Sequence, residues 1–490
     1  MGFMQTLRRK LFGGVSPLYD GAGMGRRSRT WVVGKAGAVT AIAWAQDALR
    51  AKSRDAVRKN VWAASGIEAF VANAIGTGVK PQSMVKDGAL REAIHSLWWD
   101  WCEEADAAGV TDFYGLQALA CRAMLEGGEC FVRLRSRRPG DMLTAPLQLQ
   151  VLEAEHVPIT YNTVADNGNP IRCGIEFDAI GRRVAYWMHP VHPDDPLAAP
   201  MSGTGASLID LVRVPADEVL HLFRPLRPGQ IRGEPWLARA LVKLHELDQY
   251  DDAELVRKKT AAMFAGFVRR ESSEDRLLGE TPDGALLAGL EPGTLQILEP
   301  GEDITFSQPA DVGGAYPEFM RQQLRAVAAA MGVTYEMLTG DLTQVNYSSI
   351  RAGLLEFRRR CEAIQDHVIK HQLCRPVWAA WMDAAVLAGL LDMPGYARRK
   401  RDYRAVKWIA QGWQWVDPLK EIKAQTEAIR AGLMSRAQAV SAAGYDVEDT
   451  DAEIAADNAR ADRLGLVFTT DPRHDPGIQP TDPASLQDTP

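Results

Sequence analysis

A helix end, a short turn and the start of a new helix are visible in Met331-Gly-Val-Thr-Tyr-Glu-Met-Leu-Thr-Gly-Asp341 and Asn346-Tyr-Ser-Ser-Ile-Arg351. Gly332 follows an apolar helical stripe and can supply the left-handed residue that ends a helix. A helical turn over 334–339 then ends at Gly340, and a polar loop leads to a helix starting at Ser348 or Ser349. The stretch predicts two helices joined by a polar loop.

The helix before this turn has a partner earlier in the chain. Residues 234–268 carry leucines at helical spacing, and Pro235 suits a first helical turn. Roughly 30–35 residues at about 1.5 Å each make a rod of ~50 Å. Between this rod and the helix that resumes at Pro317, turn residues alternate with the strand patterns 294–298 and 304–307. The sequence therefore predicts a helical hairpin that carries a small β tip.

A very long helix follows the polar loop. Its apolar residues step by four and three, which is typical of a close-packed seam. These residues are Ile350, Leu354, Phe357, Cys361, Ile364 and Val368. Pro376 is expected to kink this helix rather than end it.

The first half of the chain mixes helical and strand patterns, so residues 31–225 are expected to form one α+β unit. Helices are predicted over 40–76, with a boundary near Ser53 and Asp55, and over 88–108 and 112–126. Strands are predicted over 130–135, 147–151, 174–178, 184–188 and 218–223. After a Trp-rich turn, good capping residues predict three more helices, at Asp417-Pro418, Ser435 and Asp446.

Composition excludes several classes of protein. The 490 residues are 46% hydrophobic and 24% charged, which is normal for a globular protein, and their length indicates two to four structural units. No apolar run is long enough for a membrane helix. A net charge of -7 argues against a large basic nucleic-acid surface, but not against a channel along which DNA slides. The six scattered cysteines indicate reduced, buried thiols.

Motifs for catalysis are missing from the sequence, which has no phosphate loop, nucleophile elbow or zinc-protease motif. His367 and His371 have the spacing of two metal ligands, but packing on a long helix is the preferred interpretation. Asp248, Asp251 and Asp252 are interpreted as a hydrated helix face. The tryptophans at 98, 99 and 101 are expected in the core rather than stacked on bases. We expect no catalytic residue, no cofactor and no metal.

Several stretches of the sequence resemble the lambda family of tailed-phage portal proteins. The residues Met331–Asp341 and Asn346–Arg351 carry the strongest similarity. Weaker similarity lies in Leu49–Asn60, Asn73–Pro81, Gly127-Gly-Glu129, Arg227–Trp236 and Trp415–Glu421. The resemblance covers about residues 15–465 in the family's order.

The resemblance implies a mainly helical α+β portal fold, assembled as a ring with a wing, a two-helix stem, a small β-containing clip and a helical crown. Its parts would be a flexible basic arm (1–30), the wing (31–233), stem helix 1 (234–268), the clip (269–315), stem helix 2 (316–340), the tunnel loop (341–349), the kinked helix with the wing return (350–415), the crown (416–465) and a disordered tail (466–490).

The resemblance also implies roles. The ring would be dodecameric, stand at one head vertex of the virion after assembly in the host cytoplasm, and pass double-stranded DNA without reading its sequence. Its partners would be the major capsid protein and scaffold, the terminase large subunit, and then head-completion proteins, with no membrane involved.

Candidate site residues follow from these roles. The tunnel loop would offer Gln344, Val345, Asn346 and Tyr347 to DNA, although Asn346 and Ser348 could instead only cap the long helix. The clip would dock partners through Glu299, Glu302 and Asp303. These residues lie in the stretch 277–320, which contains Asp and Glu but no Lys or Arg. The stem would pack into a ring through Leu237, Leu241, Leu244, Met320 and Leu324.

Two rival functions remain open on sequence alone. An uncharacterised hydrolase or nuclease would need a convergent acid–base or metal site, for which only His367 and His371 are at hand. A soluble helical adaptor would be a monomer or dimer without a central hole.

Overall fold

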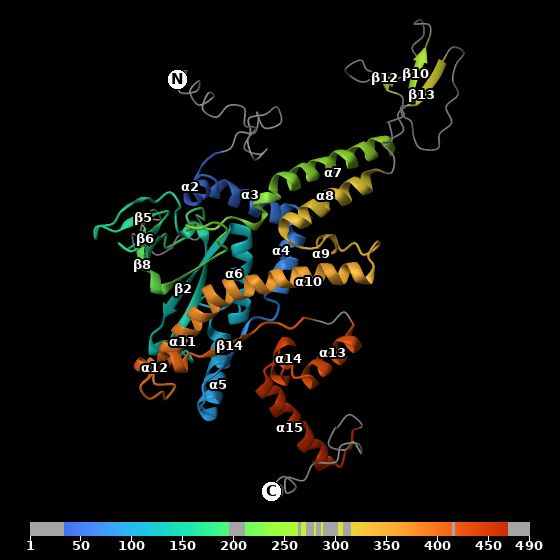
Figure 1. Ribbon diagram of the computed structural model, residues 1–490. Coiled ribbons are helices and arrows are strands. Elements are labelled where there is room, and N and C mark those ends of the chain that lie inside the picture. Colours follow the sequence, from blue (N-terminus) through green and yellow to red (C-terminus); the bar gives the residue numbers. More distant parts are fainter. Residues whose placement is uncertain are drawn as a thin grey trace, which may run out of the picture.

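The computed structural model describes residues 34–195, 211–262, 266–270, 279–280, 286–287, 302–306, 315–413 and 417–468. A mixed helical and β body lies at one side, and a helical hairpin leaves it and carries short strands at its far end (Figure 1). A separate group of three helices lies at the opposite end of the molecule. The fold is therefore α+β and mainly helical, as the sequence predicts. The expected basic arm lies outside the described residues, as does the tail from residue 469 onward.

Five helices open the described part of the body, and the last three begin at capping side chains, Asn60, Asp87 and Asp112. The helices are α2 (Ala38–Ala43), α3 (Gln46–Lys59), α4 (Val61–Ala74), α5 (Gly88–Glu104) and α6 (Phe113–Gly127). The predicted helix over 40–76 is interrupted at Asn60, whose side chain accepts hydrogen bonds from the first turn of α4. The boundary expected near Ser53 is wrong, since Ser53 lies buried inside α3.

Two antiparallel sheets complete the body. The three-stranded sheet has the order β3-β2-β9 and the five-stranded sheet has the order β4-β5-β6-β7-β8. Their strands are β2 (Glu129–Ser136), β3 (Leu147–Glu153), β4 (Thr163–Val164), β5 (Pro170–Arg172), β6 (Ile175–Phe177), β7 (Arg183–Met188), β8 (Val212–Pro215) and β9 (Val219–Phe223). All five predicted strands are confirmed, whereas β4, β5 and β8 are short strands that the pattern did not predict.

A small pair of strands, also not predicted, links the two halves of the chain. β1 (Lys80–Ser83) pairs antiparallel with β14 (Val406–Ile409), which lies in the region expected to be only a Trp-rich turn. The pairing closes the body, because it fixes the chain after the long helix to the chain before α5.

Tryptophans fill the centre of the body. Trp98 and Trp101 of α5 lie against Trp378 and Trp381 of a later helix, with ring centroids as close as 5.0 Å. The expectation of a core role is confirmed for these two residues of α5. It is wrong for Trp99, which is about half exposed and has Lys80 over its ring.

The hairpin is shorter than the sequence predicts. A 3-10 turn, η6 (Trp236–Arg239), precedes α7 (Leu241–Ala262), so helix does not extend over the whole of 234–268. Pro235 caps the 3-10 turn instead of starting the α-helix, and Val268 lies in a strand. The tip contains β10 (Gly266–Arg270), β11 (Gly279–Glu280), β12 (Leu286–Leu287) and β13 (Glu302–Phe306), and α8 (Ala315–Met331) returns to the body.

The long helix has its irregularity before the proline rather than at it. It comprises α10 (Tyr347–Ile364), a π-helical segment η7 (Gln365–Cys374) and α11 (Arg375–Leu387). The Arg375 N–H bonds to the carbonyl of Lys370, five residues back. Pro376 lacks an N–H and crowds the carbonyls of the preceding turn. The wider π turn relieves this crowding, and the helix continues past Pro376 rather than ending there, as expected.

The last part of the chain adds α12 (Tyr396–Tyr403) and then the three helices α13 (Pro418–Arg430), α14 (Arg436–Ala442) and α15 (Val447–Leu464). The predicted caps at Asp417, Ser435 and Asp446 are confirmed. None of the helices within the described ranges combines the length and apolar character needed to cross a lipid bilayer.

Candidate functional site: the junction of wing and stem

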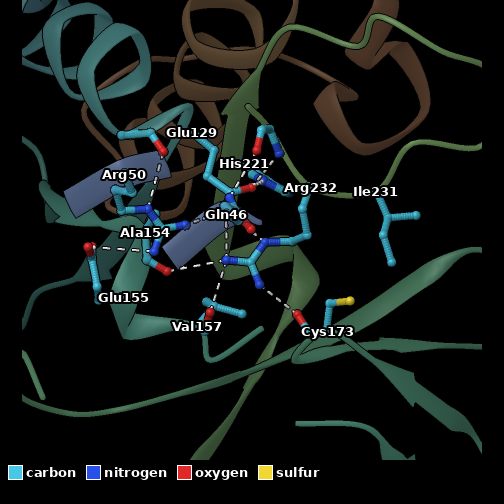
Figure 2. Close-up of polar contacts among 12 residues, drawn as sticks. Gln46, Arg50, Glu129, Ala154, Glu155, Val157, Cys173, His221, Ile231 and Arg232 are labelled. Carbon is cyan, nitrogen blue, oxygen red and sulfur yellow. Dashed lines mark hydrogen bonds and ion pairs between the residues drawn. The ribbon is translucent and has the colours of Figure 1, made fainter. Parts of the chain in front are cut away.

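A buried group of charged and polar side chains lies where the body leads into the hairpin (Figure 2). Glu129, the first residue of β2, lies at its centre and is fully buried. Its Oε1 accepts hydrogen bonds from Gln46 Nε2 at 2.6 Å and Arg232 Nε at 2.8 Å. Its Oε2 accepts the Gly233 N–H at 2.8 Å. Residues 227–236 form the lead-in to the stem. The Glu129 carboxylate therefore fixes this lead-in against the sheet.

Arg232 extends this group toward the second sheet. Its Nη1 donates to the Cys173 carbonyl at 2.7 Å, and its Nη2 donates to the Val157 carbonyl at 3.0 Å (Figure 2). The planar guanidinium also lies over the ring of Phe131, 5.6 Å from its centroid. Because one side chain bonds the sheet, the loop before β6 and the lead-in together, it fixes their relative positions.

The protonation states of Glu129 and His221 follow from burial and from the charges around them. Burial alone would raise the pKa of Glu129, but Arg232 and His221 outweigh it and hold that pKa well below its usual range. Burial lowers the pKa of His221 to about 4, despite its hydrogen bond to Glu129. His221 Nε2 therefore donates to Glu129 Oε2 at 2.9 Å, and Arg183 can donate to Nδ1 at 3.4 Å. An ionised Glu129 and a neutral His221 are the stable pair near neutral pH.

Backbone approach explains the glycines beside these charges. Gly128 has a φ of +89°, which favours glycine, and a Cβ on Gly233 would meet the Gly128 carbonyl oxygen at 2.0 Å. The chain just before β2 and the lead-in can therefore come this close only because glycines, which have no Cβ, occupy positions 128 and 233. Glu129 and Arg232 come from separate stretches that carry the portal resemblance, as does Arg50, which donates to the Gly127 carbonyl at 3.2 Å. Sequence analysis did not predict that these stretches meet.

The five predicted stem leucines and methionines do not face outward. Leu237, Leu241, Leu244, Met320 and Leu324 are all buried in the core of the single chain. Their stripe packs η6, α7 and α8 against one another and against α3. The expectation that they form contacts between subunits is therefore wrong, because a helical stripe reveals burial but not the partner that provides it.

The polar loop before α10 is held by its own residues. Asp341 accepts hydrogen bonds from the Thr343 N–H at 3.0 Å and from the Tyr335 hydroxyl at 3.0 Å, and Thr343 keeps the pKa of Asp341 below its usual value. Asn346 caps α10 by accepting the Ser349 N–H at 2.8 Å. The capping interpretation is confirmed for Asn346 but not for Ser348, because the helix begins one residue earlier than expected, at Tyr347.

Of the remaining loop candidates, Gln344 is exposed and Val345 is half-buried, while the side chain of Tyr347 lies outside the described residues. In the tip, Glu299 also lies outside them. Glu302 and Asp303 belong to β13, where the backbone places them opposite Arg270 and Arg269 of β10. The acidic run therefore has basic residues on its partner strand, which lowers its local excess of negative charge.

Two places among the described residues bring potential metal ligands near one another. His367 and His371 are both exposed on η7. The one group of three close ligand atoms in those residues is Glu153, Glu155 and His192. Its chemistry fits an ion-pair cluster better than a metal site. His192 Nδ1 accepts the Asp194 N–H at 3.2 Å, so Nε2 carries the proton and faces Glu153 at 3.1 Å. Arg54 already pairs with Glu155.

All six cysteines are free, buried thiols, as expected. Burial raises the pKa of Cys361 and of Cys374 to about 12, so both stay protonated and unreactive near neutral pH.

The fold and the junction together define the class of this protein. Its body uses buried charges to position a helical hairpin that carries a strand tip. The family model of the phage portal proteins of the lambda family matches residues 24–365. The chain belongs to this family, which confirms the resemblance seen in the sequence.

Relatives agree with this assignment. The probable portal protein of Halomonas phage phiHAP-1 is 29% identical over 390 residues, which cover 78% of this chain and 72% of that protein. The portal protein of Escherichia phage N15 is 22% identical and covers 91% of this chain and 90% of its own length. A chain from the neck of an empty gene transfer agent particle, solved with C6 symmetry, covers 80% of this chain and 92% of itself, with a TM-score of 0.44 and 16% identity.

Proposed function

We propose that the chain is one of twelve identical subunits of a closed ring at a single vertex of the phage head. Double-stranded DNA would enter and leave the head through this ring, which would contact the DNA backbone without reading its sequence. Family membership gives the portal role, and the ring with its channel is our extension of it. The role is structural, so no reaction is assigned.

The observation that carries the proposal is the apolar surface at both ends of the molecule. Across the crown helices α13, α14 and α15 and the turns between them, Ala461 is the single buried residue, while Leu419 of α13 and Leu433 of the turn after α13 are 83% and 82% exposed. On the stem, Val242 is 75% exposed. No residue of α13, α14 or α15 belongs to the buried apolar clusters of the described chain, whereas the wing has both clusters in its interior and single exposed apolar side chains such as Val110 and Ile180 on its surface. Uncovered apolar side chains at two ends of one chain indicate neighbours that cover them, and a closed ring provides a neighbour on each side.

Partners are assigned by position. The strand tip stands farthest from the body (Figure 1), and we assign it to docking of the terminase large subunit and later of head-completion proteins. The wing and crown would meet the major capsid protein and scaffold during assembly in the host cytoplasm. In the polar loop, exposed Gln344 is the candidate for weak contact with DNA phosphates, while Asn346 serves first as a helix cap.

Particle mass and shape test the ring. The purified chain should give ring-shaped particles with a central hole by negative stain, and a mass of about twelve subunits by mass photometry. Leu419→Ser with Leu433→Ser should reduce ring formation, because the proposal places these two crown residues against the neighbouring subunit, whereas Leu387 lies outside the crown and stem. Leu387→Ser, at a 91% exposed position at the end of α11, is the matched control and should form rings normally. A stable monomer or dimer in the unmodified protein would favour the helical adaptor and refute the ring.

A further inference from the structure

A pocket of about 460 Å³ opens at the root of the stem. It lies where the lead-in, the end of α8 and the start of the π-helical segment meet. Its ionisable lining consists of Arg224, Arg239, Arg360, Glu234 and His367. Three guanidinium groups thus face a space that offers a single carboxylate, so the pocket is basic in a chain whose net charge is -7.

The three arginines come from separate parts of the fold. Arg224 follows β9 and lies over the ring of Trp236, 4.8 Å from its centroid. Arg239 lies in η6 and is 3.6 Å from Glu234, and Arg360 lies in α10, 3.9 Å from Glu356. Burial lowers the pKa of Arg224, and the nearby charges of Arg239 and Arg360 lower it further. Like charges brought together by three elements repel one another unless an anion joins them.

The guanidinium groups are also accessible. The side chains of Arg239 and Arg360 are 69% and 50% exposed, so they can change partner without unfolding the stem. Guanidinium groups favour planar oxyanions, which they bind through paired hydrogen bonds. The chemistry of the pocket therefore selects a carboxylate or a phosphate.

Carboxylates, which could pair with these arginines, are concentrated on another surface of the same chain. Residues 246–254 of α7 include five Asp or Glu residues and no Lys or Arg. The buried leucines of α7 face its own chain, whereas Glu246 and Asp252 are exposed; Glu246 lies one helical turn after exposed Val242, and Asp252 lies further along α7 and about 120° around the helix from Glu246. In the described part of the chain, neither of these two carboxylates has a basic partner within 4.0 Å.

We infer that the arginine pocket of one subunit binds the exposed carboxylates of α7, Glu246 and Asp252, in a second copy of this chain. The inference rests on the proposed ring. In a ring of like subunits, each contact joins two different surfaces of the same protein, so an acidic surface and a basic one can meet at every contact. Glu246 and Asp252 lie six residues apart, about 9 Å along the helix. Glu246 lies one turn from exposed Val242, which adds an apolar contact to the charge pairing that a DNA phosphate would lack.

A charge swap in the full-length protein tests the contact. Arg239→Glu with Arg360→Glu should raise the concentration for half-assembly at least about tenfold, because like charges then face each other. Glu246→Arg with Asp252→Arg should have the same effect. The four substitutions together should restore assembly toward the unmodified value. Lys52→Glu with Lys86→Glu, at exposed positions in α3 and in the loop before α5, changes the net charge as much as the arginine pair does and should leave assembly unchanged.

Each outcome decides one question. Rings that form equally well in both pairs of reversals, or a fourfold variant no better than either pair, would overturn the contact while leaving the ring intact. Binding of inorganic phosphate or duplex DNA to the pocket in those intact rings would assign it to another oxyanion. No ring in the unmodified protein would instead refute the proposed function. If thermal melting shows that the reversals unfold, Arg239→Gln with Arg360→Gln should still weaken assembly, and unchanged assembly in that variant would overturn the contact.

Discussion

Replacing Arg232 by Met should destabilise the wing more than any exposed charge substitution. The change removes the guanidinium that bonds Glu129 and the carbonyls of Cys173 and Val157, all in the buried junction. Removing one partner of a buried ion pair costs about 3–5 kcal/mol, because the remaining charge is left in a poorly solvated site. We expect a loss of about 4 kcal/mol, which is a large part of the stability of a typical domain.

The wing reports its own unfolding. Trp98, Trp101, Trp378 and Trp381 lie together in its core, so tryptophan fluorescence during urea denaturation follows this part of the molecule. All variants are compared at one protein concentration, because assembly adds to apparent stability. Lys59→Met is the matched control. It breaks the exposed Lys59–Asp55 pair on α3, which is worth about 0.2–0.5 kcal/mol.

A double variant separates charge from packing. Glu129→Gln added to Arg232→Met removes the unpaired charge, so it should recover about 2 kcal/mol of the loss. The reasoning is refuted if Arg232→Met costs no more than Lys59→Met. It also fails if the double variant loses as much as the two single variants added together.

Other perturbations test the remaining parts. Wing stability should fall as the pH drops from 6.5 toward about 4, because the pKa of His221 is about 6.5 in the unfolded chain and about 4 in the folded one. The urea midpoint should therefore decrease over this range in the unmodified protein and depend less on pH in His221→Gln. Asn346→Ala should cost about 1 kcal/mol and speed hydrogen exchange in the first turn of α10, whereas Gln344→Ala should not change that exchange. Heads assembled with residues 343–345 deleted should begin packaging but retain shortened genomes, measured by gel sizing of packaged DNA; stably retained full-length genomes would contradict a DNA contact in this loop. Reversing Glu302 and Asp303 to Lys should weaken docking of the terminase large subunit in pull-down assays at low salt, and unchanged docking would show that the tip charge is incidental.

Local structure could be predicted from the sequence because its causes are local. The caps at Asn346, Asp417, Ser435 and Asp446 bond backbone groups two or three residues away, so residue type and spacing are sufficient. The alternating strands of the wing are visible for the same reason. The break at Asn60 was missed because apolar periodicity continues across it.

Contacts between distant segments could not be predicted in this way. β1 and β14 are separated by more than 300 residues, and their pairing leaves no periodic pattern in either strand. The junction is similar, since Arg50, Glu129, His221 and Arg232 follow no common spacing. Two of the family-like stretches did contain a weak indication of the junction, because Glu129 and Arg232 each stand next to a glycine. A charged residue beside a glycine is what a close backbone contact around a buried charge requires.

The distribution of burial gives wing and stem different tasks. The wing has a core of tryptophans, two sheets and an internally neutralised charge cluster, so one chain can hold its shape. The distal part of α7 and the crown bury almost nothing, and the basic pocket at the root of the stem has more cations than its own chain neutralises. A rigid wing with incomplete ends suits a subunit whose orientation is set from within and whose stability is completed by its neighbours. In the proposed ring, Arg232 and the lead-in would matter beyond the wing, because a change in their geometry would change the angle at which each stem meets the next.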